Sequence, residues 1–125
     1  ITKAKIPWAL GSDIGGGPYL SMFDVMQSFV EQNQRKKISE ATYSQALFRA
    51  TQAGANILNL DKTHGSLSKN KMANFLVVKS PKRKKSDTAE IILKKIINPY
   101  KKDRNAYQDI VFETYFEGRE VFRQN

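Results

Sequence analysis

The chain has 125 residues, of which 40% are hydrophobic and 26% charged, and its formal net charge is +9. This length suits one domain with a real core, and no apolar run approaches the roughly eighteen residues of a transmembrane helix. The absence of cysteine excludes disulfides and thiolate metal sites, and it favours a reducing, cytoplasmic location.

The N-terminal segment predicts a short buried strand that ends in an acidic, glycine-rich loop. Ile6–Leu10 is apolar without alternation, as strands of parallel sheets are. Asp13 follows it, and Gly15–Gly17 permit a sharp turn beside the carboxylate. Catalytic groups of α/β barrels lie at the C-terminal ends of strands, so Asp13 is the candidate catalytic residue. Spacing alone favours the alternative that Asp13 only stabilises a turn, because Asp beside Gly is common in turns.

Three helices are expected next. Ser21 and Asp24 form a capping box that opens a helix with one apolar face, made of Met22, Val25, Met26, Phe29 and Val30. Ser39 is expected to cap a second helix, whose apolar face comprises Tyr43, Ala46, Leu47 and Ala50. Residues 52–60 predict a separate short helix that ends near Leu60.

The periodicity changes in the second half of the chain. Phe75–Val78 predicts a buried strand stopped by Ser80 and Pro81. A helical face follows, made of Ala89, Ile92, Leu93, Ile96 and Ile97, and it is closed by Asn98 and Pro99. The last segment predicts a hairpin: a strand over Ile110–Phe116, a turn at Glu117-Gly118 and a return over Glu120–Phe122.

Most of the positive charge lies in residues 79–102, which hold nine basic residues against two acidic ones. Lys82–Lys85 follows Pro81 and has the composition of an exposed loop. A nucleic-acid site usually adds aromatic platforms or a reading helix to its basic residues, and no aromatic residue is interleaved among Lys82–Lys85. A solvated loop is therefore favoured over a nucleic-acid interface.

Other catalytic signals are sparse. His64 is the single histidine, and with no cysteine beside it a metal site made within this chain alone is disfavoured. Its neighbours predict a turn before a strand, so a structural role is favoured for it. The sequence has no nucleophile elbow and no phosphate-binding loop.

Several motifs in order along nearly the whole chain resemble the amidohydrolase superfamily, guanine deaminases in particular. The N-terminal motifs are Leu10–Gly17 followed by Ser21-Met22, then Phe48–Thr51 with Gly54-Ala55. The C-terminal motifs are His64–Leu67, Lys71–Val78, and Asp103–Asn105 leading into Val111–Val121 with Gly118-Arg119. Each motif alone is weak, but their shared order is specific, and the Asp-Arg-Asn ending favours guanine deaminase.

The resemblance implies a zinc-dependent hydrolytic deaminase that converts guanine and water to xanthine and ammonia. It implies a (β/α)8 barrel with a small β-sandwich, and it places the family's histidine ligands upstream of Ile1. Only Asp13 carries over from the metal shell, as both ligand and catalytic group. A carboxylate there can take a proton from water at the metal and pass it to the leaving ammonia. The absence of cysteine excludes the unrelated cytidine-type zinc deaminases.

Some residues depart from the family's pattern. Asn70 and Asn74 replace the usual Gly and Asp, and Asn59 stands where a Gly is common. These departures leave open another deaminase of the superfamily or a chlorohydrolase-like enzyme. A different class of function, a non-enzymatic basic module that binds nucleic acid or an acidic partner, rests on residues 79–102 alone.

The expected fold class is α/β, and this chain is expected to contain only part of the fold. Residues 1–60 would be C-terminal barrel elements, namely the last strand, the metal-site loop and helices. Residues 61–125 would be a small β-sandwich portion with one helix and a basic loop. One strand and one helix cannot close a barrel, and the start at Ile1 suggests a fragment or a processed product. We therefore expect no membrane partner, a purine as the substrate of the intact parent, and a homo-oligomer or association with the missing N-terminal part.

Overall fold

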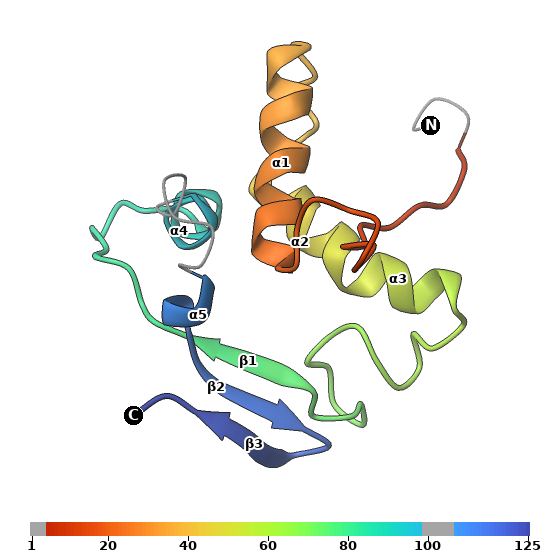
Figure 1. The fold of residues 1–125 in the computed structure, drawn as a ribbon, viewed down its shortest axis with the longest axis vertical. Coiled ribbons are helices and arrows are strands. Elements are labelled where there is room, and N and C mark those ends of the chain that lie inside the picture. The colour runs from red at the N-terminus through yellow and green to blue at the C-terminus, as the bar shows by residue number, and fades with distance from the viewer. Residues whose placement is uncertain (1–4, 99–106) are drawn as a thin grey trace.

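The computed structural model describes residues 5–98 and 107–125, which form a mixed α/β fold with a small sheet at one end and helices at the other (Figure 1). In chain order the elements are α1 (Met22–Arg35), α2 (Tyr43–Ala50), α3 (Gln52–Ile57), β1 (Phe75–Val78), α4 (Ala89–Ile97), α5 (Tyr107–Ile110), β2 (Val111–Phe116) and β3 (Arg119–Arg123). No helix within the described ranges is long and apolar enough to cross a membrane.

Helix α1 begins where the capping box predicts. The hydroxyl oxygen of Ser21 accepts a hydrogen bond from the backbone N–H of Phe23 at 3.1 Å, which satisfies one unpaired donor of the first turn. The helix ends with Lys37 in the left-handed region, and the N–H of Ile38 donates to the carbonyl of Asn33 at 3.0 Å. This arrangement is a Schellman ending.

Helix α2 begins later than the sequence predicts, and Ser39 is not its cap. The side chain of Thr42 accepts a hydrogen bond from the N–H of Gln45 at 3.1 Å and is the N-cap. Ser39 instead lies in a turn directly after the residues that close α1. In the connection between α1 and α2, Ser39 is therefore part of a turn and does not cap a helix.

Helix α3 is also shorter than expected, because it ends at Ile57 rather than near Leu60. Asn59 adopts a φ of +57°, and the N–H of Leu60 donates to the carbonyl of Ala55 at 2.8 Å. This is a second Schellman ending, in which Asn occupies the position that Gly most often fills. The departure at Asn59 thus preserves the left-handed conformation, which Asn tolerates better than most residues.

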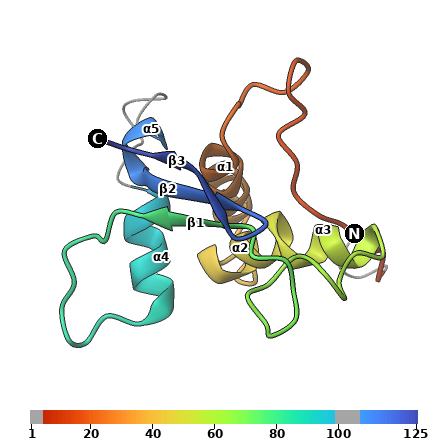
Figure 2. The ribbon, with the colours of Figure 1, turned by 90° about the horizontal axis from the view of Figure 1, so that it is seen from below.

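The core lies between α1, α2 and α4. Its buried side chains come from all three helices and are Met26, Val30, Tyr43, Ala46 and Ile97. The apolar face predicted for 89–97 therefore packs against the two earlier helices, and Figures 1 and 2 show α4 beside them. The proposed boundary near residue 60 stays a prediction, although this core joins helices from both sides of it.

A carboxylate from α4 caps the N-terminus of α2. The side chain of Glu90 accepts hydrogen bonds from the N–H of Tyr43 at 2.6 Å, the N–H of Ser44 at 2.9 Å and the hydroxyl of Ser44 at 2.6 Å. Partial burial opposes ionisation of Glu90, but these hydrogen bonds outweigh it, so the pKa of Glu90 lies below its usual value. Negative charge at this position also complements the helix dipole.

We expect Glu90→Gln to destabilise the chain by about 1–2 kcal/mol at neutral pH, because the neutral amide loses a charge-assisted cap. Since the folded-state pKa is lowered, the contribution is present above the unfolded-state pKa and disappears as the pH falls through the folded value. The difference between wild type and variant should therefore shrink as the pH falls below the usual glutamate pKa of about 4.3. Urea unfolding followed by Trp8 fluorescence measures it. Glu40→Gln, at an exposed carboxylate, is the control, and a pH-independent difference would contradict the assignment.

The sheet is antiparallel, with strand order β1-β2-β3. The predicted strand 75–78 and the hairpin are confirmed, although α5 occupies Ile110 and β3 runs from 119 to 123. Glu117 and Gly118 both have positive φ angles, of +50° and +78°, as a two-residue hairpin turn requires. The side-chain oxygen of Asn74 accepts a hydrogen bond from the N–H of Glu117 at 2.7 Å, so this departure from the family pattern fastens the hairpin to β1.

The expected strand over Ile6–Leu10 is wrong for this structure. The segment is extended but belongs to no sheet, and it runs beside the end of α2. A parallel strand needs neighbouring strands for its backbone hydrogen bonds, and the three described strands form an antiparallel sheet elsewhere. The N–H of Leu10 instead donates to the carbonyl of Arg49 at 2.9 Å.

Candidate functional site

The structure places Asp13 in an exposed turn directly after the extended segment. Its backbone has a φ of +50°, and its carbonyl accepts hydrogen bonds from the N–H groups of Gly16 at 2.9 Å and Gly17 at 2.6 Å. The backbone therefore closes into a tight loop on Asp13 itself. The carboxylate lies over Gly16, close enough that a β-carbon added there would come within 2.7 Å of Oδ2.

Steric crowding explains why residue 17 of this loop is a glycine. A β-carbon at Gly17 would collide with the carbonyl oxygen of Ser12, and that contact involves backbone atoms which cannot swing away. The triple-glycine sequence thus permits the close backbone approach that the loop needs. The predicted order of acidic loop and capped helix is confirmed, while the strand before it is not.

Arg49 holds the extended segment that leads to Asp13. Its guanidinium donates a hydrogen bond to the carbonyl of Trp8 at 3.0 Å and lies 4.1 Å from the centre of the Trp8 ring. The Trp8 ring in turn contacts Phe29 of α1, with centroids 5.5 Å apart. Together with the Leu10 hydrogen bond, these contacts anchor the segment on both α1 and α2.

The importance of Arg49 was not predicted from the sequence. Its only signal was its place in the motif Phe48–Thr51, since a lone arginine on a helix is usually a solvated surface residue. The stacking requires Trp8, which lies 41 positions earlier in the chain. Spacing within the helix therefore could not have identified the pair.

His64 lies in a turn, as predicted. Its backbone N–H donates to the carbonyl of Leu60 at 2.8 Å, and its ring Nδ1 lies 2.8 Å from the hydroxyl of Thr63. The next residue, Gly65, has a φ of +86°, and a β-carbon there would lie 2.7 Å from that of Ala55 in α3. The motifs at Gly54-Ala55 and His64–Leu67 therefore meet in space.

The chemistry available at Asp13 is that of a single hard oxygen donor. An exposed carboxylate can serve as one ligand of a zinc ion and can exchange a proton with water. Among residues 5–98 and 107–125, no group of three His, Cys, Asp or Glu side chains could hold a metal. The role of Asp13 as a metal ligand therefore stays a prediction.

Comparison with known proteins agrees with the motifs. The chain matches solved guanine deaminases from Escherichia coli, with a TM-score of 0.80 and 24% identity, and from Bradyrhizobium japonicum, with a TM-score of 0.71 and 17% identity. Each match covers 98% of this chain but only 28% and 32% of those proteins, respectively. The chain therefore spans about a third of their length or less. No curated protein matches it by sequence.

A match to a protein-family model shows which family the chain belongs to. The model of the amidohydrolase family matches residues 2–114, a range that includes the Asp13 loop, the Arg49 anchor, β1 and the first part of β2. The Asp103–Asn105 motif falls in this range but lies outside the residues that the structure describes. The chain belongs to the amidohydrolase family.

Proposed function

We propose that this chain forms the C-terminal part of a zinc-dependent guanine deaminase. The observation that carries the proposal is the similarity of nearly the whole chain to two solved guanine deaminases, at TM-scores of 0.80 and 0.71. The Asp13 loop supports it, because a carboxylate held in a glycine-closed turn after an extended segment suits the mouth of a barrel. In this proposal the segment over Ile6–Leu10 becomes a barrel strand once neighbouring strands pair with it, and the sheet becomes part of a small β-sandwich.

The reaction adds water to the carbon that carries the amino group of guanine and releases ammonia. The metal, when bound, supplies Lewis-acid activation of water near neutral pH. The Asp13 carboxylate accepts the proton that water loses when the new carbon–oxygen bond forms. It then returns that proton to the amino group, which leaves as ammonia when the carbon–nitrogen bond breaks. The Arg49 anchor and the Gly17 turn keep the carboxylate in place between these steps.

The test compares the complete protein that contains these residues with the isolated 125-residue chain. We expect the complete protein to convert guanine to xanthine, followed by absorbance, and to lose this activity on treatment with a zinc chelator. The isolated chain should neither bind zinc tightly nor deaminate guanine, because one carboxylate cannot replace the three or four protein ligands that zinc requires. Hydrolysis of a different amine by the complete protein would favour another deaminase of the family, and hydrolysis of a chloro-substituted substrate would favour a chlorohydrolase.

Association is the second expectation of this proposal. Several large apolar side chains near the Asp13 loop are exposed, among them Ile6, Ile14 and Leu20 at 58%, 74% and 67%. We expect the isolated chain to form a dimer or a larger assembly, or to bind the rest of the parent protein, because such exposed apolar surface favours association. Light scattering on the pure chain measures this state. A monodisperse monomer with cooperative unfolding would contradict the expectation.

A further inference from the structure

The basic loop, Lys82–Lys85, is held against α4 by hydrogen bonds. The ammonium group of Lys95 donates to the carbonyl of Lys82 at 3.0 Å and to the carboxylate of Asp87 at 2.6 Å. That carboxylate also accepts the N–H of Lys84 at 2.8 Å, and these bonds lower the pKa of Asp87 below its usual value. The loop thus holds a defined conformation on one side of the helix.

Both carboxylates of residues 79–98 are already engaged, and they form a salt bridge with only one cationic side chain of this segment. Asp87 pairs with Lys95, and Glu90 is occupied in capping α2. Six cationic side chains of the described segment 79–98 are exposed and form no salt bridge with a carboxylate of that segment; these are Lys79, Lys82, Arg83, Lys84, Lys85 and Lys94. The region therefore presents an excess of positive charge that its two carboxylates, Asp87 and Glu90, do not balance.

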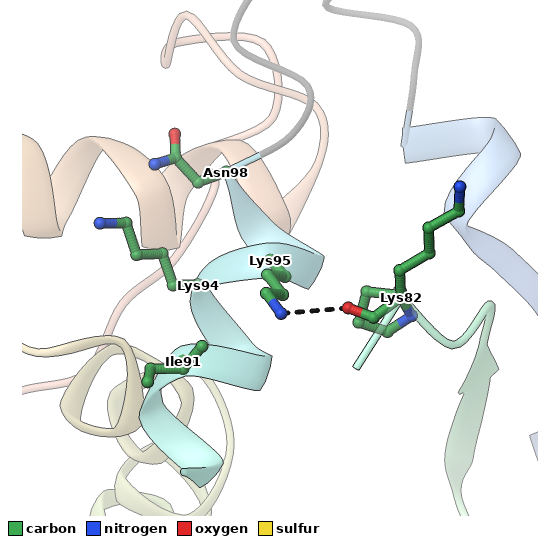
Figure 3. A pocket seen from close by; sticks show the side chains of 6 residues that line it. Lys82, Ile91, Lys94, Lys95 and Asn98 are labelled. Carbon is green, nitrogen blue, oxygen red and sulfur yellow. Dashed lines mark hydrogen bonds between the residues drawn. The ribbon is translucent and has the colours of Figure 1, made fainter. Parts of the chain in front are cut away.

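Five of these cations surround two shallow hollows. The larger, of about 660 Å³, is lined by Pro81, Lys82, Ile91, Lys94, Lys95 and Asn98. Figure 3 shows Lys82 and Lys94 on opposite sides of Lys95, with Ile91 one turn along the helix. The smaller, of about 430 Å³, is lined by Arg83, Lys84, Lys85, Asp87 and Ile92. Each hollow combines an isoleucine with cations at its rim.

We infer that this basic surface, formed by the loop Lys82–Lys85 and the exposed side of α4, binds an acidic protein segment that carries aliphatic side chains among its carboxylates. Glutamate or aspartate side chains of the segment would pair with Lys82 and Lys94, and an aliphatic side chain would cover Ile91, which is 40% exposed. Charge complementarity supplies attraction over several ångströms and sets the encounter rate. Burial of the isoleucine adds an apolar contribution that a purely ionic ligand cannot make.

The apolar residues of the larger hollow, Pro81 and Ile91, favour an acidic peptide over nucleic acid as the ligand. Sequence-tolerant binding of single strands depends on aromatic rings that stack on bases, and residues 79–98 contain no aromatic side chain. Phosphates alone would use the lysines and leave Ile91 and Pro81 uncovered. This inference does not rest on the proposed deaminase activity, because the surface contains none of the residues assigned to that reaction.

Fluorescence anisotropy with the 125-residue chain tests the inference. The probe is a labelled synthetic peptide in which glutamates alternate with leucines, and two charge-matched comparisons are an oligoglutamate peptide and a single-stranded oligonucleotide. We expect the glutamate–leucine peptide to bind more tightly than either comparison, with affinity that falls as salt rises. Tighter binding of the oligonucleotide would overturn the assignment of the partner.

Variants locate the site. Lys82→Ala combined with Lys94→Ala should weaken binding of the glutamate–leucine peptide about fivefold to tenfold, as expected for two exposed ion pairs. The matched control, Lys62→Ala with Lys69→Ala, removes the same charge from exposed positions outside the surface and should have a much smaller effect. Ile91→Gln keeps a helix-forming side chain but should remove the advantage of the leucine-containing peptide over oligoglutamate. Equal losses in the two lysine pairs, or no effect of Ile91→Gln, would overturn the inference.

Discussion

In the proposed guanine deaminase, Asp13→Asn should reduce turnover of guanine by about a hundredfold to ten-thousandfold, the range typical of a lost general acid–base group. Asparagine has nearly the same shape and keeps one oxygen, but its amide cannot accept the proton that water loses. The substitution also keeps a residue that tolerates the φ of +50° at this position, so the loop should retain its conformation. The rate of xanthine formation measures the loss.

Two controls separate chemistry from folding in that experiment. Asp61→Asn makes the same change at an exposed aspartate outside the loop and should leave the rate within about twofold of wild type. The melting temperature of the isolated 125-residue chain should be the same with Asp13→Asn as in wild type, because Asp13 is exposed in this chain and an exposed carboxylate contributes little to stability. An Asp13→Asn enzyme that keeps wild-type turnover would remove Asp13 from the mechanism.

Gly65→Ala should destabilise the isolated chain by about 2–4 kcal/mol, through backbone strain and overpacking together. The φ of +86° is unfavourable for any residue with a β-carbon, and the new carbon would lie 2.7 Å from Cβ of Ala55 and 3.0 Å from Cα of Gln52. Such a loss is a large share of the 5–15 kcal/mol stability typical of a domain. Urea unfolding monitored by the single tryptophan, Trp8, measures it.

The matched control is Gly11→Ala, because a β-carbon at Gly11 would meet nothing within 4 Å and its φ is not in the left-handed region. A double variant, Ala55→Gly with Gly65→Ala, should recover the part of the loss that comes from the contact with Ala55. It should not recover the part that comes from the φ of Gly65. Equal stability of the Gly65→Ala and Gly11→Ala chains would contradict the close packing of this turn on α3.

Sequence and structure agree best where the signal is local. The capping of α1 by Ser21, the Glu117-Gly118 turn and the extent of α4 each depend on residues within a few positions of one another, so their patterns were sufficient. The Asp13 loop was predicted for the same reason. Adjacent glycines and an aspartate indicate a tight turn whatever surrounds it.

Agreement is poorer at helix ends, where several residues compete for one role. Ser39 and Thr42 are both good N-caps, and only the path of the chain after α1 decided that Thr42 caps α2. Residues 58–60 could have continued α3, but the left-handed Asn59 and the carbonyl of Ala55 close it earlier. Propensity allowed both outcomes in each case, because the differences between them are small.

By itself the sequence determined the family motifs, the local turns and caps, the apolar helix faces and the candidate carboxylate Asp13. Only the tertiary structure decided which distant groups meet: Glu90 with the start of α2, Arg49 with Trp8, and Gly65 with Ala55. It also decided that Ile6–Leu10 forms no strand here, because an apolar segment becomes a strand only when neighbouring strands take its backbone hydrogen bonds. Composition and spacing cannot encode those partners, since they lie tens of residues away or in other strands.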